Sequence, residues 1–190
     1  MNAVNDTRFV LIRHGESMWN AAGRWQGQGD PPLSPRGREQ AARLAAQLAA
    51  EGIDVIVTSD LSRAQETAAI LADTLGLRSV PESRLRELDI GAWTGLCRRE
   101  IEAGDRAALL HFESGAPTSR AGGGESRQEV AARVRPAVAE IAARYAGRCI
   151  AVVCHLGVVR ALLPGTELDN ATCCRVTAQQ LAAAAAGAAP

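Results

Sequence analysis

Short apolar runs alternate along the chain with longer segments whose apolar residues recur at helical spacing. One apolar run lies at 8–12, and the runs at 53–59 and 149–154 are apolar on both faces, as is typical of strands covered by helices on either side. Helical spacing marks residues 34–51, 61–75 and 126–146. We therefore predict an α/β sandwich on a parallel sheet with right-handed crossovers, although periodicity does not encode the order of the strands.

Capping residues set the expected helix ends. Ser34 is a good N-cap and Pro35 suits the first helical position, while Gly52 can end this helix in the left-handed conformation. Gly76 is expected to stop the second helix. Pro136 is expected to bend or break the third helix, because proline lacks a backbone N–H and its ring crowds the preceding turn.

Two segments depart from this alternation. Residues 97–124 are less regular and end in AGGGES, so we expect an excursion from the sheet and a candidate lid. The C-terminal LAAAAAGAAP is low in complexity, and we expect residues 182–190 to be frayed. With 190 residues and 47% hydrophobic content the chain can bury one substantial core, so residues 1–190 are predicted to form a single domain.

Composition excludes several classes of function. The formal net charge is zero and all 21 basic residues are arginine, without a basic run, so neither nucleic acid nor a membrane surface is an expected partner. No apolar run reaches the roughly 18 residues that a membrane span needs. The five cysteines form no CxxC pair and the three histidines show no ligand spacing, so we expect free thiols, no metal and a cytoplasmic protein.

Chemical groups concentrate where the predicted strands end. The first strand ends in Arg13 and His14, the second leads to Ser59 and Arg63, and the third ends in His155. In open α/β sheets the ligand crevice lies beyond the carboxyl ends of the strands. Guanidinium groups bind phosphate well, and neutral imidazole is a competent nucleophile toward phosphorus. The pattern predicts phosphoryl transfer in which arginines and a second imidazole replace the magnesium that other enzymes use.

Phosphoryl transfer also needs an acid for the leaving oxygen. Glu87, in LRELDIGAWTG, is the candidate, because the glycines that follow let the chain bend back toward the crevice; Asp89 and Glu125 are alternatives. Attack by neutral His14 with departure assisted by protonated Glu87 predicts a bell-shaped dependence of turnover on pH. His111 is assigned no chemical role. The tryptophans, which either wall the pocket mouth or pack in the core, are Trp19, Trp25 and Trp93.

Six segments carry a resemblance that spans nearly the whole chain. In order they are LIRHGESMWN, GRWQGQGDPPLSPRGREQA, TSDLSRAQETA, RLRELDIGAWTGL, GGGESRQEVAARV and AVVCHLGVVRAL. Together they resemble the histidine phosphatase superfamily, in its phosphoglycerate-mutase-like branch. The resemblance implies a three-layer α/β/α sandwich around a mostly parallel sheet, and a phosphohistidine intermediate on His14 that forms without a metal or other cofactor.

The same resemblance implies roles for individual residues. Arg13, Arg63 and His155 are expected to hold the phosphoryl oxygens, and Glu87 matches the proton donor. The residues expected to contact the substrate are Asn20, Gln26, Gly27 and Leu156.

Three departures limit what the resemblance implies about the substrate. Leu156 stands where many relatives have glycine, and the connection 163–170 looks shorter than usual. The compact chain also lacks the longer insertions with which mutases close their site against water. We therefore favour a phosphatase for small phosphomonoesters over a phosphoglycerate mutase or a non-catalytic phosphate-binding regulatory protein. The expected partner is a small phosphorylated metabolite or inorganic phosphate, while its identity and the oligomeric state are not encoded in the pattern.

Overall fold

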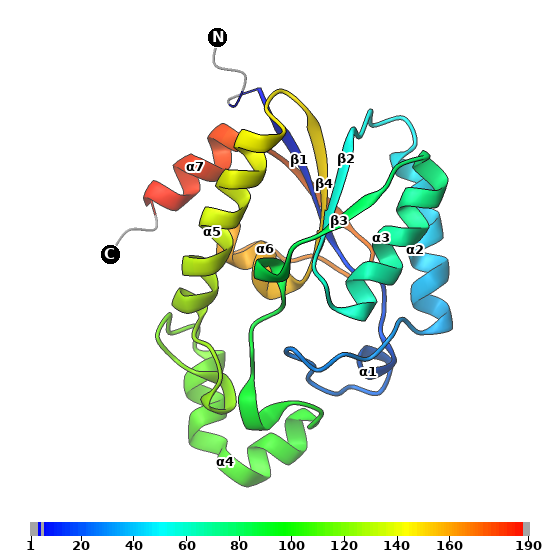
Figure 1. The fold of residues 1–190 in the computed structure, drawn as a ribbon. Coiled ribbons are helices and arrows are strands. Elements are labelled where there is room, and N and C mark those ends of the chain that lie inside the picture. Colours follow the sequence, from blue (N-terminus) through cyan, green and yellow to red (C-terminus); the bar gives the residue numbers. More distant parts are fainter. Residues whose placement is uncertain (1–3, 5, 188–190) are drawn as a thin grey trace.

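The computed structural model describes residue 4 and residues 6–187, which contain a five-stranded sheet in the order β3-β2-β4-β1-β5 (Figure 1). The strands are β1 (Arg8–Arg13), β2 (Val55–Thr58), β3 (Ser79–Pro81), β4 (Cys149–Cys154) and β5 (Cys173–Thr177). The first four run parallel, and β5 pairs antiparallel with β1 at the edge. The predicted mostly parallel sheet is confirmed, and the structure supplies its strand order.

Helices cover both faces of the sheet (Figure 1). One face carries α2 (Pro35–Leu48) and α3 (Ser62–Leu75), and the other carries α5 (Arg127–Arg144), α6 (Leu156–Leu162) and α7 (Ala178–Gly187). Successive side chains of a strand point to opposite faces. Phe9 and Leu11 of β1 therefore join the core with α5, while Val10 and Ile12 join the core with α2 and α3. The predicted α/β/α layers are confirmed.

Sequence signals place most of the helix ends correctly. The Ser34 hydroxyl accepts a hydrogen bond from the Gly37 N–H, and Pro35 begins α2. Gly76 ends α3 with a φ of 65°. Gly52 also has a positive φ, of 64°, but α2 ends earlier, at Leu48.

The break considered for Pro136 does not occur, because α5 continues through this residue to Arg144. The helix is buried against the sheet on both sides of the proline, at Val134 and Val138. Packing of an apolar face contributes more to helix stability than intrinsic propensity does. The carbonyl of Ala132, which loses its hydrogen-bond donor at Pro136, belongs to an exposed residue that water can reach.

The segment 97–124 is more regular than the sequence indicates. It contains α4 (Arg98–Glu113), in which Asp105 has φ −152° and ψ 80°, so that two helical stretches meet at a kink. The helix buries Ile101 and Leu109, whose spacing fits one apolar helix face, although this pattern was not recognised in the sequence. Figure 1 shows α4 beyond the end of the sheet, in agreement with the expected excursion. The remaining short helices are α1 (Met18–Ala21), η1 (Ser83–Leu85), η2 (Gly91–Trp93) and η3 (Ala121–Gly123).

The C-terminal segment is helical where fraying was expected. α7 runs to Gly187, which corrects the expectation for residues 182–187, while 188–190 lie outside the described residues. Thr177 and Gln180 exchange hydrogen bonds between side chain and backbone at the start of the helix. Alanine has the highest helix propensity, and Leu181 is buried in the core with α5.

The structure also bears on the predictions about membrane spans and cysteines. Within the described ranges, no helix is both long enough and apolar enough to cross a membrane. The five cysteines are free thiols. Burial raises the pKa of the Cys154 thiol, so this neighbour of His155 stays protonated and does not compete as a nucleophile.

Candidate active site

The carboxyl ends of β1, β2 and β4 meet at one edge of the sheet. Arg13 of β1 is in register with Cys154 of β4, so His14 and His155, each one residue further on, become neighbours. Their ring centroids are 5.1 Å apart. Ser59 follows β2, and its Oγ lies 2.9 Å from His155 Nε2. The structure therefore brings together the strand ends that the sequence singled out.

Hydrogen bonds fix the tautomer of His14. Its Nδ1 donates to the Gly15 carbonyl at 2.7 Å, and its Nε2 accepts from Arg63 Nε at 3.2 Å. This assignment follows from the partners, because a carbonyl only accepts and a guanidinium only donates. Burial lowers the pKa of His14 well below the usual 6.5, and the charge of Arg63 lowers it further. At neutral pH, His14 is an uncharged imidazole whose lone pair lies on Nε2.

Arg63 is fully buried although it carries a charge. Its Nη1 and Nη2 donate to the carbonyls of Gly29 and Gly27 at 2.7 and 2.8 Å, so the guanidinium fixes this loop as well as His14. Burial lowers the pKa of Arg63 to about 10, which leaves the group charged at neutral pH. Arg63 forms no ion pair with the described residues, and an anion bound nearby would offset the cost of burying its charge.

Two buried polar atoms at this edge have no hydrogen-bond partner within the described part of the chain, namely Arg13 Nε and His155 Nδ1. Burial lowers the pKa of His155 well below 6.5, and the Arg63 charge acts in the same direction, so this ring is also neutral. The Ser59 hydroxyl can either donate to His155 Nε2 or accept from it, so this contact alone does not fix the tautomer. Buried polar atoms are nearly always paired. An anion with several oxygens could accept from Arg13 Nε, and also from His155 Nδ1 when that nitrogen carries the proton.

Glu87 reaches the same place from the loop after η1. Its carboxylate accepts from the Gly157 N–H at 3.3 Å. Only glycine permits this approach, because a Cβ at residue 157 would lie 2.2 Å from Glu87 Oε1. The alternatives Asp89 and Glu125 do not line the cavity at this edge, and Glu125 is paired with Arg133 at 2.8 Å. Of the three acids considered from the sequence, Glu87 is therefore the one placed to reach a substrate.

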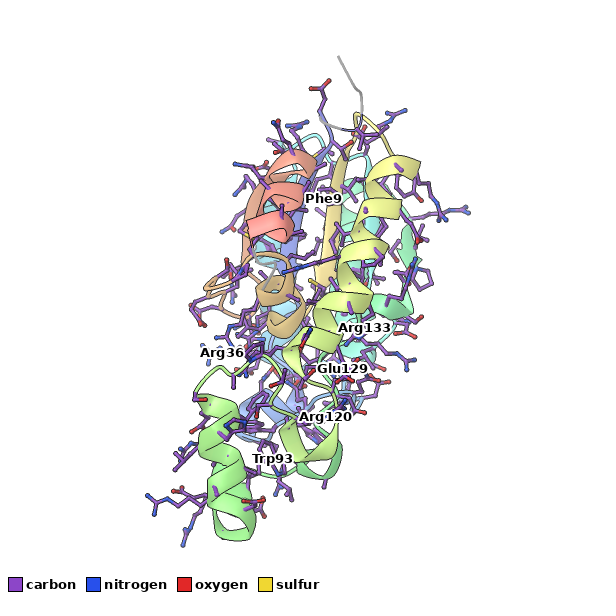
Figure 2. All side chains as sticks on the ribbon, turned by 90° about the vertical axis from the view of Figure 1, so that its left-hand side faces the viewer. Phe9, Arg36, Trp93, Arg120, Glu129 and Arg133 are labelled. Atoms are coloured by element: carbon purple, nitrogen blue, oxygen red, sulfur yellow. The ribbon has the colours of Figure 1, made fainter. Side chains whose placement is uncertain are left out.

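Arg133 holds the loop that carries Glu87. Its guanidinium donates to the carbonyls of Arg84, Arg86 and Glu87 at 2.7, 2.8 and 3.0 Å. Figure 2 shows Arg133 on α5, above the Arg120–Glu129 ion pair that ties the η3 segment to the same helix. Sequence reasoning missed Arg133, although it lies in a matched segment, because no pattern marks an arginine whose partners are backbone carbonyls.

A cavity of about 900 Å³ opens at this edge of the sheet. Its volume is in the range of small-molecule sites, and it is far larger than a phosphoryl group requires. The predicted site residues that line it are Arg13, His14, Asn20, Gln26, Gly27, Arg63, Glu87 and Leu156. His155 is fully buried beside His14 and is not part of the cavity wall.

Two supporting residues were not predicted from the sequence. Ser17 Oγ donates to Gln26 Oε1 at 2.6 Å, which fixes that amide. Asn170 Nδ2 donates to the His14 carbonyl at 3.1 Å and to Asn20 Oδ1 at 3.3 Å. Asn170 lies in the short connection after α6, so this connection braces the nucleophile. No periodic signal could have identified it.

The other candidate residues divide between cavity and core. Trp25 lines the cavity and Trp93 is buried, with their rings 5.7 Å apart in an edge-to-face contact, so each alternative holds for one tryptophan. Figure 2 shows Trp93 close to α4, where its ring lies 5.9 Å from Phe112. His111 is exposed. Among the described residues, no group of three or more His, Cys, Asp and Glu side chains is arranged to hold a metal ion.

Comparison with known proteins places this geometry in a family. Residues 9–183 match the family model of the histidine phosphatase superfamily (branch 1). The chain is 41% identical over 163 residues to the glucosyl-3-phosphoglycerate phosphatase of Mycobacterium tuberculosis (strain CDC 1551 / Oshkosh), which covers 82% of this chain and 73% of the relative. It is 36% identical over 166 residues to phosphoserine phosphatase 1 of Hydrogenobacter thermophilus, covering 86% and 79%.

Further matches agree in fold and differ in the activity named. A probable phosphoglycerate mutase of Enterobacter sp. (strain 638) is 41% identical over 139 residues, covering 70% of this chain and 62% of the relative. The solved structure of a mycobacterial glucosyl-3-phosphoglycerate phosphatase in complex with VO3 matches with a TM-score of 0.84 and 37% identity, covering 90% of each chain. The chain therefore belongs to the histidine phosphatase superfamily, branch 1.

Proposed function

We propose that the protein hydrolyses small phosphomonoesters through a phosphohistidine intermediate on His14, without a metal ion. The observation that carries this proposal is a neutral imidazole, His14, near the buried atoms Arg13 Nε and His155 Nδ1, neither of which has a hydrogen-bond partner among the described residues. The buried guanidinium of Arg63 adds positive charge at the same place. A phosphoryl group supplies the acceptor oxygens and the negative charge that these groups lack.

The first step forms the phosphohistidine. His14 Nε2 gives up the hydrogen bond that it accepts from Arg63 Nε and attacks phosphorus. A nitrogen–phosphorus bond forms, and the ester oxygen–phosphorus bond breaks. Glu87, in its protonated form, transfers its proton to the departing oxygen, so that a neutral alcohol leaves. Arg13 and Arg63, which line the cavity, donate to the phosphoryl oxygens as charge moves onto them. We infer from the family resemblance that His155, whose ring lies directly behind the cavity wall, contributes as well.

The second step returns the protein to its starting state. Glu87, now a carboxylate, takes a proton from water, and the water oxygen attacks phosphorus. The nitrogen–phosphorus bond breaks, inorganic phosphate leaves, and His14 recovers its lone pair. Glu87 is protonated again and His14 is free, so the protein is ready for the next turnover.

Hydrolysis is preferred to mutase activity because nothing in the chemistry retains the phosphoryl group once water enters.

We infer that residues 97–124 act as a lid at the outer end of the cavity, which is supported by the lining residues Phe112, Pro117 and Thr118. We also infer that the described residues fold as a single domain, since both core clusters share the strands of one sheet. Relatives named as phosphatases support the same reaction.

Acid-labile labelling tests the intermediate. Brief incubation with a phosphomonoester, followed by alkaline quenching and peptide mass spectrometry, is expected to place one phosphoryl group on His14. His14→Ala should abolish both the label and turnover, while EDTA should leave the wild-type rate unchanged. Persistent hydrolysis in the variant would refute the proposal. Conversion of 3-phosphoglycerate to its 2-isomer, without release of phosphate, would favour a mutase.

A further inference from the structure

The charge of the cavity wall exceeds what a single phosphoryl group needs. Six arginines line it: Arg13, Arg24, Arg63, Arg127, Arg135 and Arg160. Glu87 is the one carboxylate among the described residues that line the same cavity. Arg13 and Arg63 serve the phosphoryl group in the proposed function, so four positive charges remain to be explained.

Two of these four already have carboxylate partners. Arg24 lies 3.5 Å from Glu100, and Arg160 pairs with Glu167. All of these side chains are at least two-fifths exposed, so the pairs are weak and screened by water and salt. A stronger anion could therefore compete for either arginine.

The other two, Arg127 and Arg135, form no ion pair within the part of the chain that the structure describes. Each donates to a backbone carbonyl, at 2.9 Å to Phe112 and at 3.2 Å to Ala161. Both lie on α5, with Ala131 between them on the lining face. At a rise of about 1.5 Å per residue they are about 12 Å apart along the helix. They therefore mark two separate places on the wall.

Contacts with Phe112 fix the orientation of the Arg127 guanidinium. Its guanidinium carbon lies 4.1 Å from the centre of the Phe112 ring, and Nη1 is bonded to the carbonyl of the same residue. This stacking orients the planar group while its other N–H groups have no hydrogen bond to the described residues. An orientation fixed in advance reduces the conformational entropy that is lost on binding.

Arg160 connects Arg127 with the phosphoryl site. Burial is the largest cause of the lowered pKa of Arg127, and the positive charge of Arg160 lowers it further. Burial is also the largest cause of the lowered pKa of Arg13, and Arg160 again acts in the same direction. All three of these arginines line the same cavity, so their charges act together on its wall. Positive charge concentrated in a partly buried cleft attracts anions. The potential thus extends from the strand ends toward the outer part of the cavity.

We propose that the substrate carries a second oxyanion besides the scissile phosphoryl group, and that Arg127 binds this oxyanion with Arg160 beside it. The shared chemistry is a planar carboxylate or a second phosphate, both of which match a guanidinium fork. Apolar side chains of Trp25, Phe112 and Leu156 line the same cavity and suit an organic linker between the two charges. This inference rests on the proposed function and narrows it to one substrate class.

Matched substrates test the inference. 3-Phosphoglycerate and glycerol 3-phosphate differ only in a carboxylate against a hydroxymethyl group, and fructose 1,6-bisphosphate and fructose 6-phosphate differ in a second phosphate. The wild-type kcat/KM is expected to be about 10- to 100-fold higher for the doubly anionic member of one pair, as for a hydrogen bond between charged groups. The pair that shows the preference identifies the oxyanion. A ratio near one in both pairs overturns the inference.

Variants assign the preference to Arg127. Arg127→Met is expected to reduce the ratio at least tenfold, mainly through KM, while Arg127→Lys keeps part of it. Arg99→Met is the matched control, because Arg99 is exposed on α4 and does not line the cavity; it should leave the ratio unchanged. An unaltered ratio in a folded Arg127→Met protein overturns the assignment. Thermal unfolding of each variant checks that the protein is still folded. A changed ratio then reflects the loss of the Arg127 guanidinium and not misfolding.

Binding separates this inference from the proposed function. In a His14→Ala background, which prevents turnover, calorimetric titration should show tighter binding of the doubly anionic ligand, and this preference should be lost when Arg127→Met is added. Turnover of all four esters without preference overturns the inference and leaves the proposed function intact. Preference in binding without any turnover by wild-type protein supports the inference and overturns the function. Absence of both overturns both.

Discussion

The inner and outer ends of the cavity are built differently. At the inner end, His14, Arg63 and His155 are almost completely buried and follow or face strands of one sheet, where strand register and backbone carbonyls fix them. At the outer end, Arg127 and Arg160 lie on helices, where Arg127 is half-buried and Arg160 is exposed.

This difference separates the two tasks of the site. The transfer of a phosphoryl group is the same for every phosphomonoester, and its residues lie where the backbone leaves little freedom. Recognition of the rest of the substrate lies on helix faces, where a side chain can change without disturbing the sheet. Substitutions of the phosphoryl-binding residues at the inner end should therefore lower turnover of all substrates alike, whereas those at the outer end should change the ratio between substrates.

The largest effect is expected from Arg63→Met. This change removes a charge from the reacting centre and leaves the carbonyls of Gly27 and Gly29 without their donor. We expect kcat/KM to fall about 10³-fold or more, and equally for p-nitrophenyl phosphate and glycerol 3-phosphate. Steady-state kinetics on the folded variant provides the measurement. Arg43→Met, an exposed change on α2, serves as the control and should stay within about twofold of wild type. A loss restricted to one ester would contradict the separation of tasks.

Glu87→Gln should have the next largest effect. Without a transferable proton, release of an alkoxide becomes limiting, so turnover of glycerol 3-phosphate should fall about 10²- to 10⁴-fold. The loss should be smaller for p-nitrophenyl phosphate, whose leaving group needs no proton. Asp89→Asn is the control, because it keeps the oxygen that accepts from the Gly91 N–H. Equal losses for the two esters would mean that Glu87 is not the acid.

Arg133→Met should act through Glu87. The guanidinium holds three carbonyls of the loop before and at this acid, so its removal is expected to lower kcat about tenfold with little change in KM. As a positioning residue it should reproduce the leaving-group dependence of Glu87→Gln, which general destabilisation would not do. Kinetics of the double variant checks this role. Arg133→Met should lower kcat much less in the Glu87→Gln background than in the wild-type protein. If the losses in kcat of the two single variants simply multiply in the double variant, Arg133 does not act through Glu87.

The smallest effect concerns stability and pH. Burial, followed by the charge of Arg63, lowers the pKa of His14 and His155 in the folded chain, so below about pH 6.5 the unfolded chain binds protons that the folded chain does not. The free energy of unfolding should therefore fall with decreasing pH, by up to about 1.4 kcal/mol per pH unit for each histidine. Urea unfolding between pH 7.5 and 5.5 measures this slope. His14→Gln should reduce this slope.

Sequence reasoning succeeded where the chemistry follows a strand. The apolar runs locate β1, β2 and β4, and parallel pairing then forces the residues after them to one edge. This is why Arg13, His14 and His155 could be grouped before any coordinates were known. Glu87 could be identified only by the motif around it, since its position depends on a glycine on another helix.

The outer wall could not be predicted for a physical reason. An arginine such as Arg127 has the same local pattern as any charged residue on a helix surface, and only tertiary packing shows whether a carboxylate lies opposite. The kink at Asp105 in α4 is likewise a feature of the folded chain that the sequence pattern did not reveal. Side-chain partners and changes of helix axis are properties of the folded chain that a periodic pattern does not contain.

The antiparallel edge strand has a consequence for motion. β5 covers the outer side of β1, so the Arg13 amide donates to the Thr172 carbonyl while the His14 amide donates to the Cys154 carbonyl on the other side. These amides can exchange with deuterium only when strands separate, whereas those of α4 can exchange by opening of a peripheral helix. Local opening of α4 therefore need not disturb His14, which is held by backbone hydrogen bonds between β4 and the segment before β5.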